Sequence, residues 1–425
     1  MPQTPERMRA LFERLWPINR SIAGPGLRET LDILAEMVPT RRITRPTGSE
    51  VFDWTVPEEW AVHGAYFVDP DGHRHADVAE HNLHLVAHSV PFRGRMSLDE
   101  LRPHLHTLPE QPEAIPYVAS FYRRDWGFCL SHRELLELPD GEYEVVIDTE
   151  LRPGHVEVGE AVLEGETTDE VLFSTYVCHP MLASNELSGP LVLAFLYERL
   201  RAMEHRRLTY RFVLSAETIG TLCYLHERGE HLRERLVAGY VLTCLGDPGK
   251  FTLKTSRRGD TLADRAAAVV LHGRPHTTIP FDPGNGSDER QYCSPGFDLP
   301  VASVMRTMYS LYPEYHTSLD NQDYVSFEAM AEGVELYAAI VRALEANRTW
   351  VSQAPYGEPQ LGKRGLYPGT STKAPLSVKP TMWVVNLADG AHDLLAIAER
   401  SRQPIDELIE AADKLAAAGL LKPAA

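Results

Sequence analysis

Residues 175–190 read TYVCHPMLASNELSGP, and this stretch decides the fold class of the chain. The apolar run that leads into it is typical of a buried strand, and the SGP at its end is typical of the start of a helix. His179, Asn185 and Glu186 stand between the two. The junction therefore predicts either a cluster of functional polar side chains at a strand end or an ordinary polar loop in front of a helix.

The same alternation of strand and helix continues along the chain after Gly154. Apolar strands are predicted at VEVGEAVLEG, EVLFSTYVC, YRFVLSAE, AGYVLTCLG and LPVASVMR, with amphipathic helices between them at 188–204, from about 220 and near 263, and a closing helix at 325–347. Such alternation favours an α/β fold, here a mixed β-sheet flanked by helices. Its catalytic groups are expected at the strand ends.

The rest of the chain can be divided into segments by its pattern of apolar residues and of Pro, Gly and Asp. Residues 5–38 have helical periodicity broken by SIAGPG, and short β-like runs separated by Pro, Gly and Asp follow. We predict an α/β domain from 1–50 and 151–350, an inserted β-rich domain at 51–150, a linker at 351–376 and a winged-helix-like domain at 377–425. The aromatic residues of the insertion are expected to form its own small core or, alternatively, a lid over the cleft; they are Trp54, Trp60, Tyr117, Phe121, Tyr122, Trp126 and Phe128.

The composition limits which cellular compartment and which binding partners are expected for this protein. The formal net charge of −18 argues against a nucleic-acid or acidic-membrane surface, and residues 378–425 hold five Lys/Arg against seven Asp/Glu. The winged helix is therefore expected to pack or to bind protein, not nucleic acid. There is no signal-peptide pattern and no apolar run of membrane-spanning length, and five scattered cysteines fit reduced thiols. We expect a cytoplasmic protein without membrane partners, and a homo-oligomer stays open.

Four segments concentrate titratable residues where strands should end: CHPMLASNELSG, SAETIG, CLGD, and the pair GNGSDERQY with EYHTSLDN. Each segment also has an interpretation without a functional role. His179 can be a loop histidine, Glu217 can cap a helix and Asp247 can lie in a turn. Together they supply what a hydrolytic zinc site needs, namely His and carboxylate ligands, an open position for water and a carboxylate base that is not a ligand.

In this order and spacing the segments resemble the M28-type zinc aminopeptidases of clan MH. The resemblance is to an aminopeptidase-like subgroup of DUF4910 type, with an inserted (DUF2172-like) β-rich domain and a C-terminal winged helix. The motifs that carry it are His179, NELSG (185–189), ETIG (217–220), Asp247, SDE (287–289) and YHTSLD (315–320). It implies that His179 and His316 are metal ligands, that Glu217 is the general base, and that Asp247 is the carboxylate of a second metal.

Three departures from that pattern change the expected metal site. Asn185 stands where the family has its bridging aspartate, with Glu186 next to it, and Thr218 replaces a ligating glutamate. An amide oxygen is a weaker ligand than a carboxylate. One Zn²⁺ per chain is thus expected in place of two, held by His179, His316 and Glu186, with Asp247 as a further candidate ligand.

The third departure, Glu289 in place of a histidine, makes the substrate end more acidic. Asp288 and Glu289 are predicted to receive a free α-amino group, and Arg290 or Tyr292 to steady an oxyanion or a carboxylate, with Asn185 also counted as substrate-binding. Asp288 can instead orient a ligating histidine. The predicted function is an aminopeptidase-like hydrolase acting on a small peptide or amide. The alternatives are a deacylase acting on a non-peptide metabolite and a non-catalytic scaffold.

Overall fold

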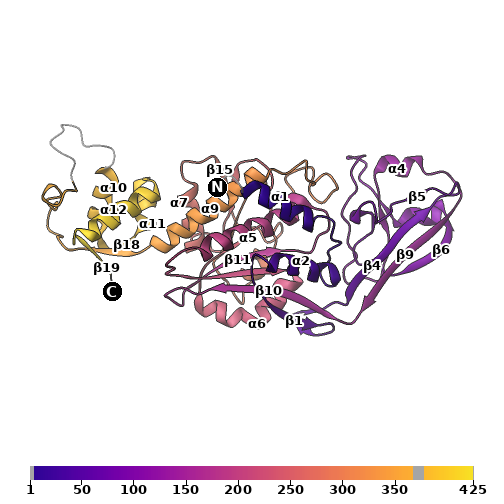
Figure 1. Ribbon diagram of the computed structural model, residues 1–425, viewed down its shortest axis with the longest axis horizontal. Coiled ribbons are helices and arrows are strands. Elements are labelled where there is room, and N and C mark those ends of the chain that lie inside the picture. Colours follow the sequence, from indigo (N-terminus) through magenta and orange to yellow (C-terminus); the bar gives the residue numbers. More distant parts are fainter. Residues whose placement is uncertain (1–3, 367–377, 425) are drawn as a thin grey trace. The chain divides into compact units, whose positions relative to one another are not determined.

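The computed structural model of the protein describes residues 4–366 and 378–424. The chain forms two compact units, which are described separately below. Unit 1 comprises Met1–Gly259 and Thr277–Val334, and unit 2 comprises Asp260–His276 and Glu335–Ala425. The colours of Figure 1 follow the sequence and identify the segments of each unit.

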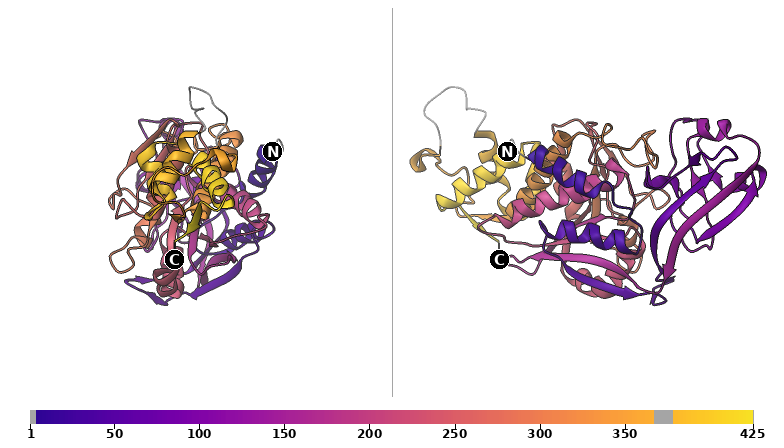
Figure 2. Two further views of the ribbon diagram at one scale, coloured as in Figure 1. Left: turned by 90° about the vertical axis from the view of Figure 1, so that its left-hand side faces the viewer. Right: turned by 45° about the vertical axis from the view of Figure 1, so that its right-hand side comes forward.

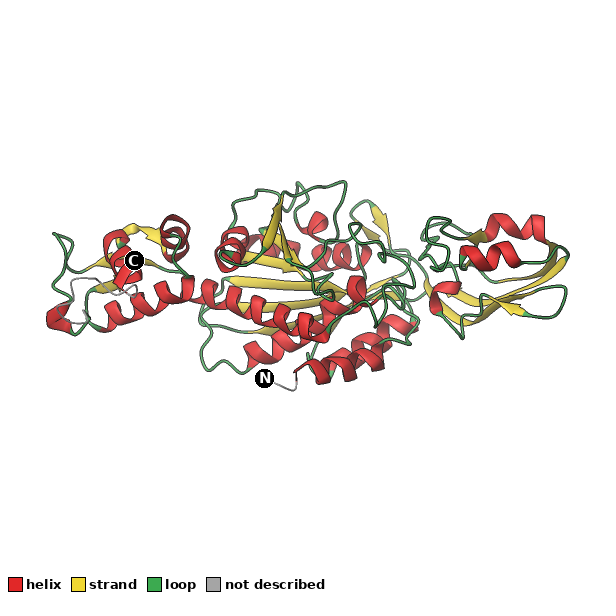
Figure 3. Ribbon diagram, turned by 90° about the horizontal axis from the view of Figure 1, so that it is seen from above, coloured by secondary structure: helices red, strands yellow, loops and turns green. Residues whose placement is uncertain are grey.

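The centre of unit 1 is a mixed sheet of eight strands, drawn as yellow arrows in Figure 3. β11 pairs in parallel with β12 and β13, and β13 pairs in parallel with β16, whereas β1 and β10 add an antiparallel edge. The predicted α/β fold is confirmed. In spatial order the strands are β1 (Arg41–Pro46), β10 (His155–Leu163), β12 (Thr209–Ser215), β11 (Glu170–Tyr176), β13 (Leu236–Val241), β16 (Val301–Met305), β14 (Phe251–Lys254) and β15 (His276–Ile279).

Helices α5 (Ser188–Arg201) and α6 (Ile219–Arg235) lie on opposite faces of this sheet, as Figure 1 shows. α5 joins β11 to β12, and α6 leads from β12 past β11 to β13. Crossovers between parallel strands are right-handed, so two crossovers that run in opposite directions place their helices on opposite faces. Every residue of β11 and of β12 is buried, as expected for strands covered on both sides.

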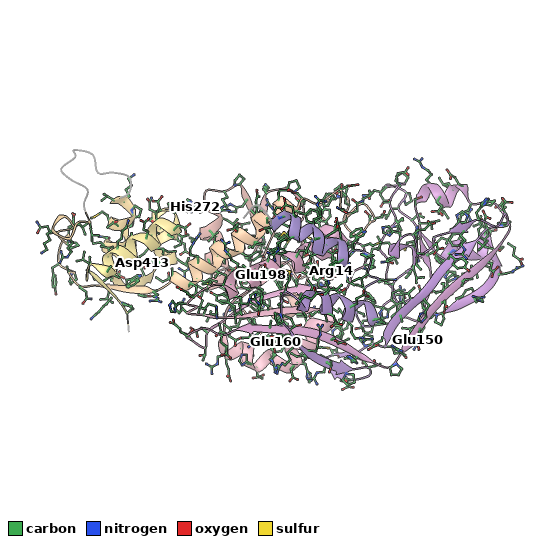
Figure 4. All side chains as sticks on the ribbon, in the orientation of Figure 1. Arg14, Glu150, Glu160, Glu198, His272 and Asp413 are labelled. Carbon is green, nitrogen blue, oxygen red and sulfur yellow. The ribbon has the colours of Figure 1, made fainter. Side chains whose placement is uncertain are left out.

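The predicted pair of N-terminal helices is present as α1 (Thr4–Leu15) and α2 (Pro25–Ala35). Arg14 on α1 forms an ion pair with Glu36, just after α2, and Arg7 forms one with Glu198 on α5. Figure 4 labels Arg14 and Glu198. The Phe12 ring meets Phe327, at the start of α9 (Phe327–Ala346), edge to face with 5.5 Å between centroids. The loop between α1 and α2 is thereby held against the sheet domain.

The β-rich insertion has a four-stranded antiparallel sheet, drawn in purple in Figure 2. Trp60 and Phe128 belong to its buried core and Trp126 packs against it, whereas Trp54 and Tyr122 are 40% and 52% exposed. The aromatic residues are thus divided between a core and a surface. The elements are β2 (Glu50–Val51), β3 (Trp54–Thr55), β4 (Glu59–Val68), β5 (Arg74–His75), β6 (Phe92–Ser97), α3 (Leu98–Leu101), β7 (Leu105–His106), β8 (Phe128–Cys129), α4 (His132–Glu137) and β9 (Glu142–Arg152).

Unit 2 contains three C-terminal helices and a three-stranded sheet in the order β18-β17-β19. The sheet begins at Thr349, inside the segment assigned to the preceding domain, because β17 pairs with both other strands. Part of the predicted linker, 367–376, lies outside the described residues. The elements are α7 (Leu262–Leu271), β17 (Thr349–Ser352), α10 (Val378–Leu387), β18 (Asp389–Asp393), α11 (Leu394–Ser401), α12 (Ile405–Ala417) and β19 (Leu421–Pro423).

Two further observations concern the whole chain. Within residues 4–366 and 378–424, no helix combines the length and the apolar character needed to cross a membrane. All five cysteines are buried free thiols.

Candidate functional site

The predicted site residues His179 and Glu217 meet at the carboxyl ends of neighbouring parallel strands. β11 ends three residues before His179, and β12 ends two residues before Glu217. The Nε2 atom of His179 lies 3.7 Å from Oε2 of Glu217, and the two side chains are 7% and 26% exposed. An imidazole nitrogen and a carboxylate therefore face each other in a nearly closed space that still reaches solvent.

The other ring nitrogen of His179 is held by Glu186. Nδ1 lies 2.6 Å from Oε2 of Glu186, whose side chain is completely buried. Glu186 is carried by a π-helical turn, Ala183–Leu187, directly before α5, and such turns are frequent at functional sites. A hydrogen bond to Nδ1 fixes the ring and leaves Nε2 directed toward Glu217.

Arg20, in the loop after α1, also contacts this site, and no sequence pattern predicted that contact. Its side chain is fully buried, and its Nε donates to the carbonyl oxygen of His179 at 3.0 Å while Nη1 donates to Leu15. Burial lowers the pKa of Arg20 to about 10, and the charge of Glu186 opposes that shift. The guanidinium therefore stays charged and provides a buried cation near the Glu186 carboxylate.

His316 comes from a loop far along the chain and adopts a left-handed backbone with φ of 56°. Its ring centroid lies 5.5 Å from that of His179, and Tyr315 stacks on it at 3.9 Å. Burial, with help from His179, lowers the pKa of His316 to about 3. The imidazole is therefore neutral, the form that binds a metal.

A segment of the insertion fastens the His316 loop. Tyr117 N–H donates to the carbonyl oxygen of His316 at 2.8 Å, and Ser318 N–H donates to Ile115 at 2.8 Å. The Tyr117 ring lies 5.0 Å from the His179 ring and 5.2 Å from the His316 ring, edge-on to both. The insertion thus contributes a side chain to the centre of the site, which sequence periodicity could not indicate.

Asn185 lies on the same π-helical turn as Glu186. Its Nδ2 donates to the Tyr176 hydroxyl at 2.8 Å, while Asp320 accepts the backbone N–H groups of Ser184 and Asn185 at 2.6 and 3.0 Å. Burial raises the pKa of Asp320 to about 6. Three buried oxygens of this turn, Ser184 Oγ, Asn185 Oδ1 and Glu186 Oε1, have no hydrogen-bond partner within the described part of the chain.

Glu217 is presented by a strained turn. Thr218 has φ 63° and ψ −75°, and Ile219 N–H donates back to the Glu217 carbonyl at 2.8 Å, which is the rare γ-turn. Thr218 N–H donates to Asp288 Oδ1 at 2.8 Å and so helps to hold this geometry. Strained backbone of this kind persists where the surroundings fix it and is concentrated at functional sites.

The environment of Glu217 makes its carboxylate more basic than an exposed one. Burial raises the pKa of Glu217, against the effects of His179 and of a hydrogen bond from Ser287 Oγ at 2.5 Å. Burial also raises the pKa of Asp288 to about 8, and the Glu217 charge adds to that shift. Two neighbouring carboxyl groups that resist ionising together can hold a proton between them.

Four predicted site residues are placed elsewhere or already have partners. Asp247 accepts hydrogen bonds from Gly249 N–H and from both the backbone N–H and the hydroxyl of Thr307, so its carboxylate links the loop after β13 to the loop after β16. Arg290 contacts the Ser287 carbonyl at 3.3 Å. The other two such residues are Glu289 and Tyr292.

Glu289, on the short helix α8 (Glu289–Tyr292), forms a buried ion pair with Lys254 at 2.8 Å, with 1% and 0% of the side chains exposed. Lys254 also donates to the Tyr309 hydroxyl at 2.8 Å. Tyr292 lies in a hydrophobic cluster and its hydroxyl pairs with Ser174 at 2.9 Å. The structure therefore directs neither side chain toward His179.

The donor set at the histidines fits a zinc ion. Cys178, His179 and Glu186 bring potential ligand atoms within 4.8 Å of one another, and the His316 ring centroid lies 5.5 Å from that of His179. Asn185 Oδ1, on the same turn as Glu186, is buried without a hydrogen-bond partner within the described residues. Burial raises the pKa of the Cys178 thiol to about 11. Imidazole and oxygen ligands are typical of a zinc site that keeps a position for water.

A pocket of about 330 Å³ opens beside Glu217 and His179. Its wall comes from the insertion and from the α1–α2 loop, and its floor comes from the strand ends. The lining residues are Ile22, Trp54, Phe121, Tyr122, Cys178, His179, Glu217, Thr218 and Ile219.

Comparison with known proteins agrees with this fold. Residues 9–347 match the family model described as domain of unknown function DUF4910, and residues 348–423 match a winged helix-turn-helix model. A protein of Clostridium acetobutylicum whose name proposes polysaccharide biosynthesis and an aminopeptidase-like domain is 40% identical over 97% of this chain and 95% of its own length.

Solved structures give the same result. The crystal structure of a proposed peptidase from Clostridium acetobutylicum has a TM-score of 0.93 and 38% identity, covering 99% of this chain and 97% of that one. A zinc aminopeptidase from Bacillus subtilis has a TM-score of 0.58 and 11% identity, covering 81% and 95%. A peptidase M28 precursor from Shewanella amazonensis has a TM-score of 0.56 and 12% identity, covering 80% and 92%. At such identities the last two structures bear on the fold alone.

Proposed function

The chain belongs to the family described as domain of unknown function DUF4910, and on that premise we propose that it is a metal-dependent, peptidase-like hydrolase that cleaves an amide bond in a small substrate. One observation carries the proposal. His179 is held by Glu186 at one ring nitrogen and faces Glu217 with the other, at the ends of parallel strands. We also propose a cytoplasmic location, because all five cysteines are free thiols, as is usual in a reducing compartment.

His179 and His316 would hold a single zinc ion, and Asn185 Oδ1, which has no hydrogen-bond partner within the described residues, is a candidate for a further ligand. Zinc, when bound, supplies a Lewis acid and lowers the pKa of a water molecule. We propose one ion because Asn185 and Thr218 put neutral side chains at two of the positions where M28-type enzymes, by the resemblance above, have carboxylates.

We assign Glu186 to the orientation of His179 in place of the ligand role expected from sequence. Its Oε2 already accepts from Nδ1 at 2.6 Å, and Arg20 provides the compensating charge behind it. A carboxylate that accepts from a ligating histidine fixes the ring and raises its basicity.

Glu217 is proposed as the general base. Its raised pKa brings it closer to the operating pH, and Ser287 holds one of its oxygens while the other faces His179. Glu217 accepts a proton from the attacking water and returns it to the leaving amine. Asp288 acts as a positioning residue, because it holds the Thr218 N–H that shapes the turn.

Removal of the metal tests the proposal as a whole. Amide hydrolysis is expected to disappear when the protein is dialysed against a chelator and to return when one equivalent of zinc is added. A panel of peptide amides and acylated amines supplies the substrates. Activity that survives complete metal removal, verified by elemental analysis, would contradict the proposed mechanism.

Substitution of Glu186 by Gln tests its assigned role. If Glu186 only orients the ligand His179, its substitution is expected to weaken zinc binding by about 10- to 100-fold without abolishing it. Competition with a fluorescent chelator measures the affinity. Glu36→Gln, at an exposed ion pair of α2, is the matched control and should leave zinc affinity unchanged. Complete loss of zinc from Glu186→Gln would return Glu186 to the ligand role.

A deacylase of non-peptide amides is the second candidate, and one observation favours it. Neither side chain predicted to receive a free α-amino group lines the pocket beside Glu217: Glu289 is neutralised by Lys254, and Asp288 is buried and holds the Thr218 N–H with one oxygen. A substrate whose nitrogen is already acylated does not need such a group.

A further inference from the structure

The pocket beside Glu217 has a wall whose aromatic side chains are not explained by core packing. Trp54 and Tyr122 are 40% and 52% exposed, and their rings meet edge to face at 5.5 Å. Phe121, Ile22 and Ile219 complete the apolar lining. Large exposed apolar side chains that line a concave site mark a place where a ligand binds.

The charges around this pocket restrict what can occupy it. Among its nine lining residues Glu217 is the only carboxylate, and none is a lysine or an arginine. Glu217 is needed as the base, so no second carboxylate of the lining remains for an ammonium group. Asp288 and Glu289 are buried and do not line the pocket; Glu289 pairs with Lys254, and Asp288 accepts from Thr218 N–H with Oδ1 while its Oδ2 has no hydrogen-bond partner within the described residues.

We infer that this pocket binds an uncharged apolar ring or chain next to the scissile amide, so that the substrate is an acylated or otherwise neutral amide and not a peptide with a free amino terminus. The inference rests on the proposed function and adds the substrate class. Desolvating an ammonium group in an apolar pocket without a partner costs several kcal/mol, whereas burying an apolar ring there is favourable.

A sugar ring is the other flat ligand that aromatic walls accept. A pyranose needs hydrogen-bonding side chains around its hydroxyl groups. Outside Glu217 and His179, the side chains of the lining offer the hydroxyls of Tyr122 and Thr218, the Trp54 indole N–H and the Cys178 thiol, which are few for the several hydroxyl groups of a pyranose. The apolar ring is therefore the better match.

Calorimetric titration of the Glu217→Gln protein tests the inference, because the ligand is then not consumed. The probes are N-acetyl-phenylalanyl-glycinamide, the same peptide without the acetyl group, N-acetyl-glycyl-glycinamide and N-acetylglucosamine, at pH 6.5, where an α-amino group of pKa about 7.7 to 8.0 is charged. The first probe is expected to bind at least about tenfold more tightly than the other three.

Two variants at the pocket wall are combined with these titrations. Trp54→Ala and Tyr122→Ala, each added to Glu217→Gln, are expected to weaken binding of the first probe by roughly fivefold or more. Tyr356→Ala is the matched control, since Tyr356 is 98% exposed and does not line the pocket. It should leave binding unchanged.

The outcomes separate the inference from the proposed function. Equal binding of the unacetylated peptide, tighter binding of N-acetylglucosamine, or an unchanged affinity in both wall variants would overturn the inference. Binding as expected together with no hydrolysis by zinc-loaded wild-type protein would overturn the proposed function and leave the pocket assignment standing. If the peptide with a free amino group is hydrolysed at least as fast as its acetylated form, the inference is overturned and the proposed function stands.

Discussion

Glu217→Gln is expected to lower kcat/KM for amide hydrolysis by about 10²- to 10⁴-fold, the usual contribution of a general base. Glutamine has nearly the same shape but cannot take a proton. The loss should appear in kcat, because proton transfer occurs in the transition state. Zinc content should not change, because Glu217 is not assigned as a ligand.

Steady-state kinetics on zinc-loaded protein measure this effect. Glu227→Gln is the matched control, since Glu227 lies on α6, is 41% exposed and pairs with Arg45. It should keep wild-type rates. A Glu217→Gln protein that retains activity within about threefold of wild type would exclude Glu217 as the base.

Lys254→Met is expected to have the largest effect on stability, lowering the free energy of unfolding of unit 1 by about 3 to 5 kcal/mol. The variant leaves the Glu289 carboxylate buried without its counter-charge, since both side chains are inaccessible to solvent. Urea unfolding followed by tryptophan fluorescence measures the change. Lys250→Met, at an exposed lysine of the same segment, should have almost no effect.

A double variant distinguishes the lost pair from simple damage to packing. Lys254→Met combined with Glu289→Gln removes both charges and keeps the oxygen that accepts from Ser287 N–H and Tyr309. It should recover a large part of the lost stability. If the double variant is no more stable than Lys254→Met, the loss does not come from an unpaired buried carboxylate.

The sequence could predict the parts of the site that lie directly after strands. His179 and Glu217 follow runs whose apolar character predicts β11 and β12, and parallel strands bring their carboxyl ends to one edge. Helices α5 and α9 were also predictable, from apolar residues that recur with a helical period. The α/β class followed from the alternation alone.

What sequence could not supply are the contacts between distant segments. Arg20, Tyr117 and Trp54 come from the α1–α2 loop and the insertion, and they reach His179 only through tertiary packing. Glu289 was predicted to contact substrate because its partner, Lys254, is 35 positions away in the sequence and could not be identified from it. Asp247 was predictable as a polar residue after a strand, but its orientation depends on the hydrogen bonds from Thr307.

The most direct test of the central claim, a zinc site built on His179 and His316, is elemental analysis of purified wild-type protein and of His316→Ala. We expect roughly one zinc ion per chain in the wild type and none in the variant, with unchanged circular dichroism showing that the variant is folded. Wild-type protein that takes up no zinc from a zinc-containing buffer, or a His316→Ala protein that retains it, would contradict the account.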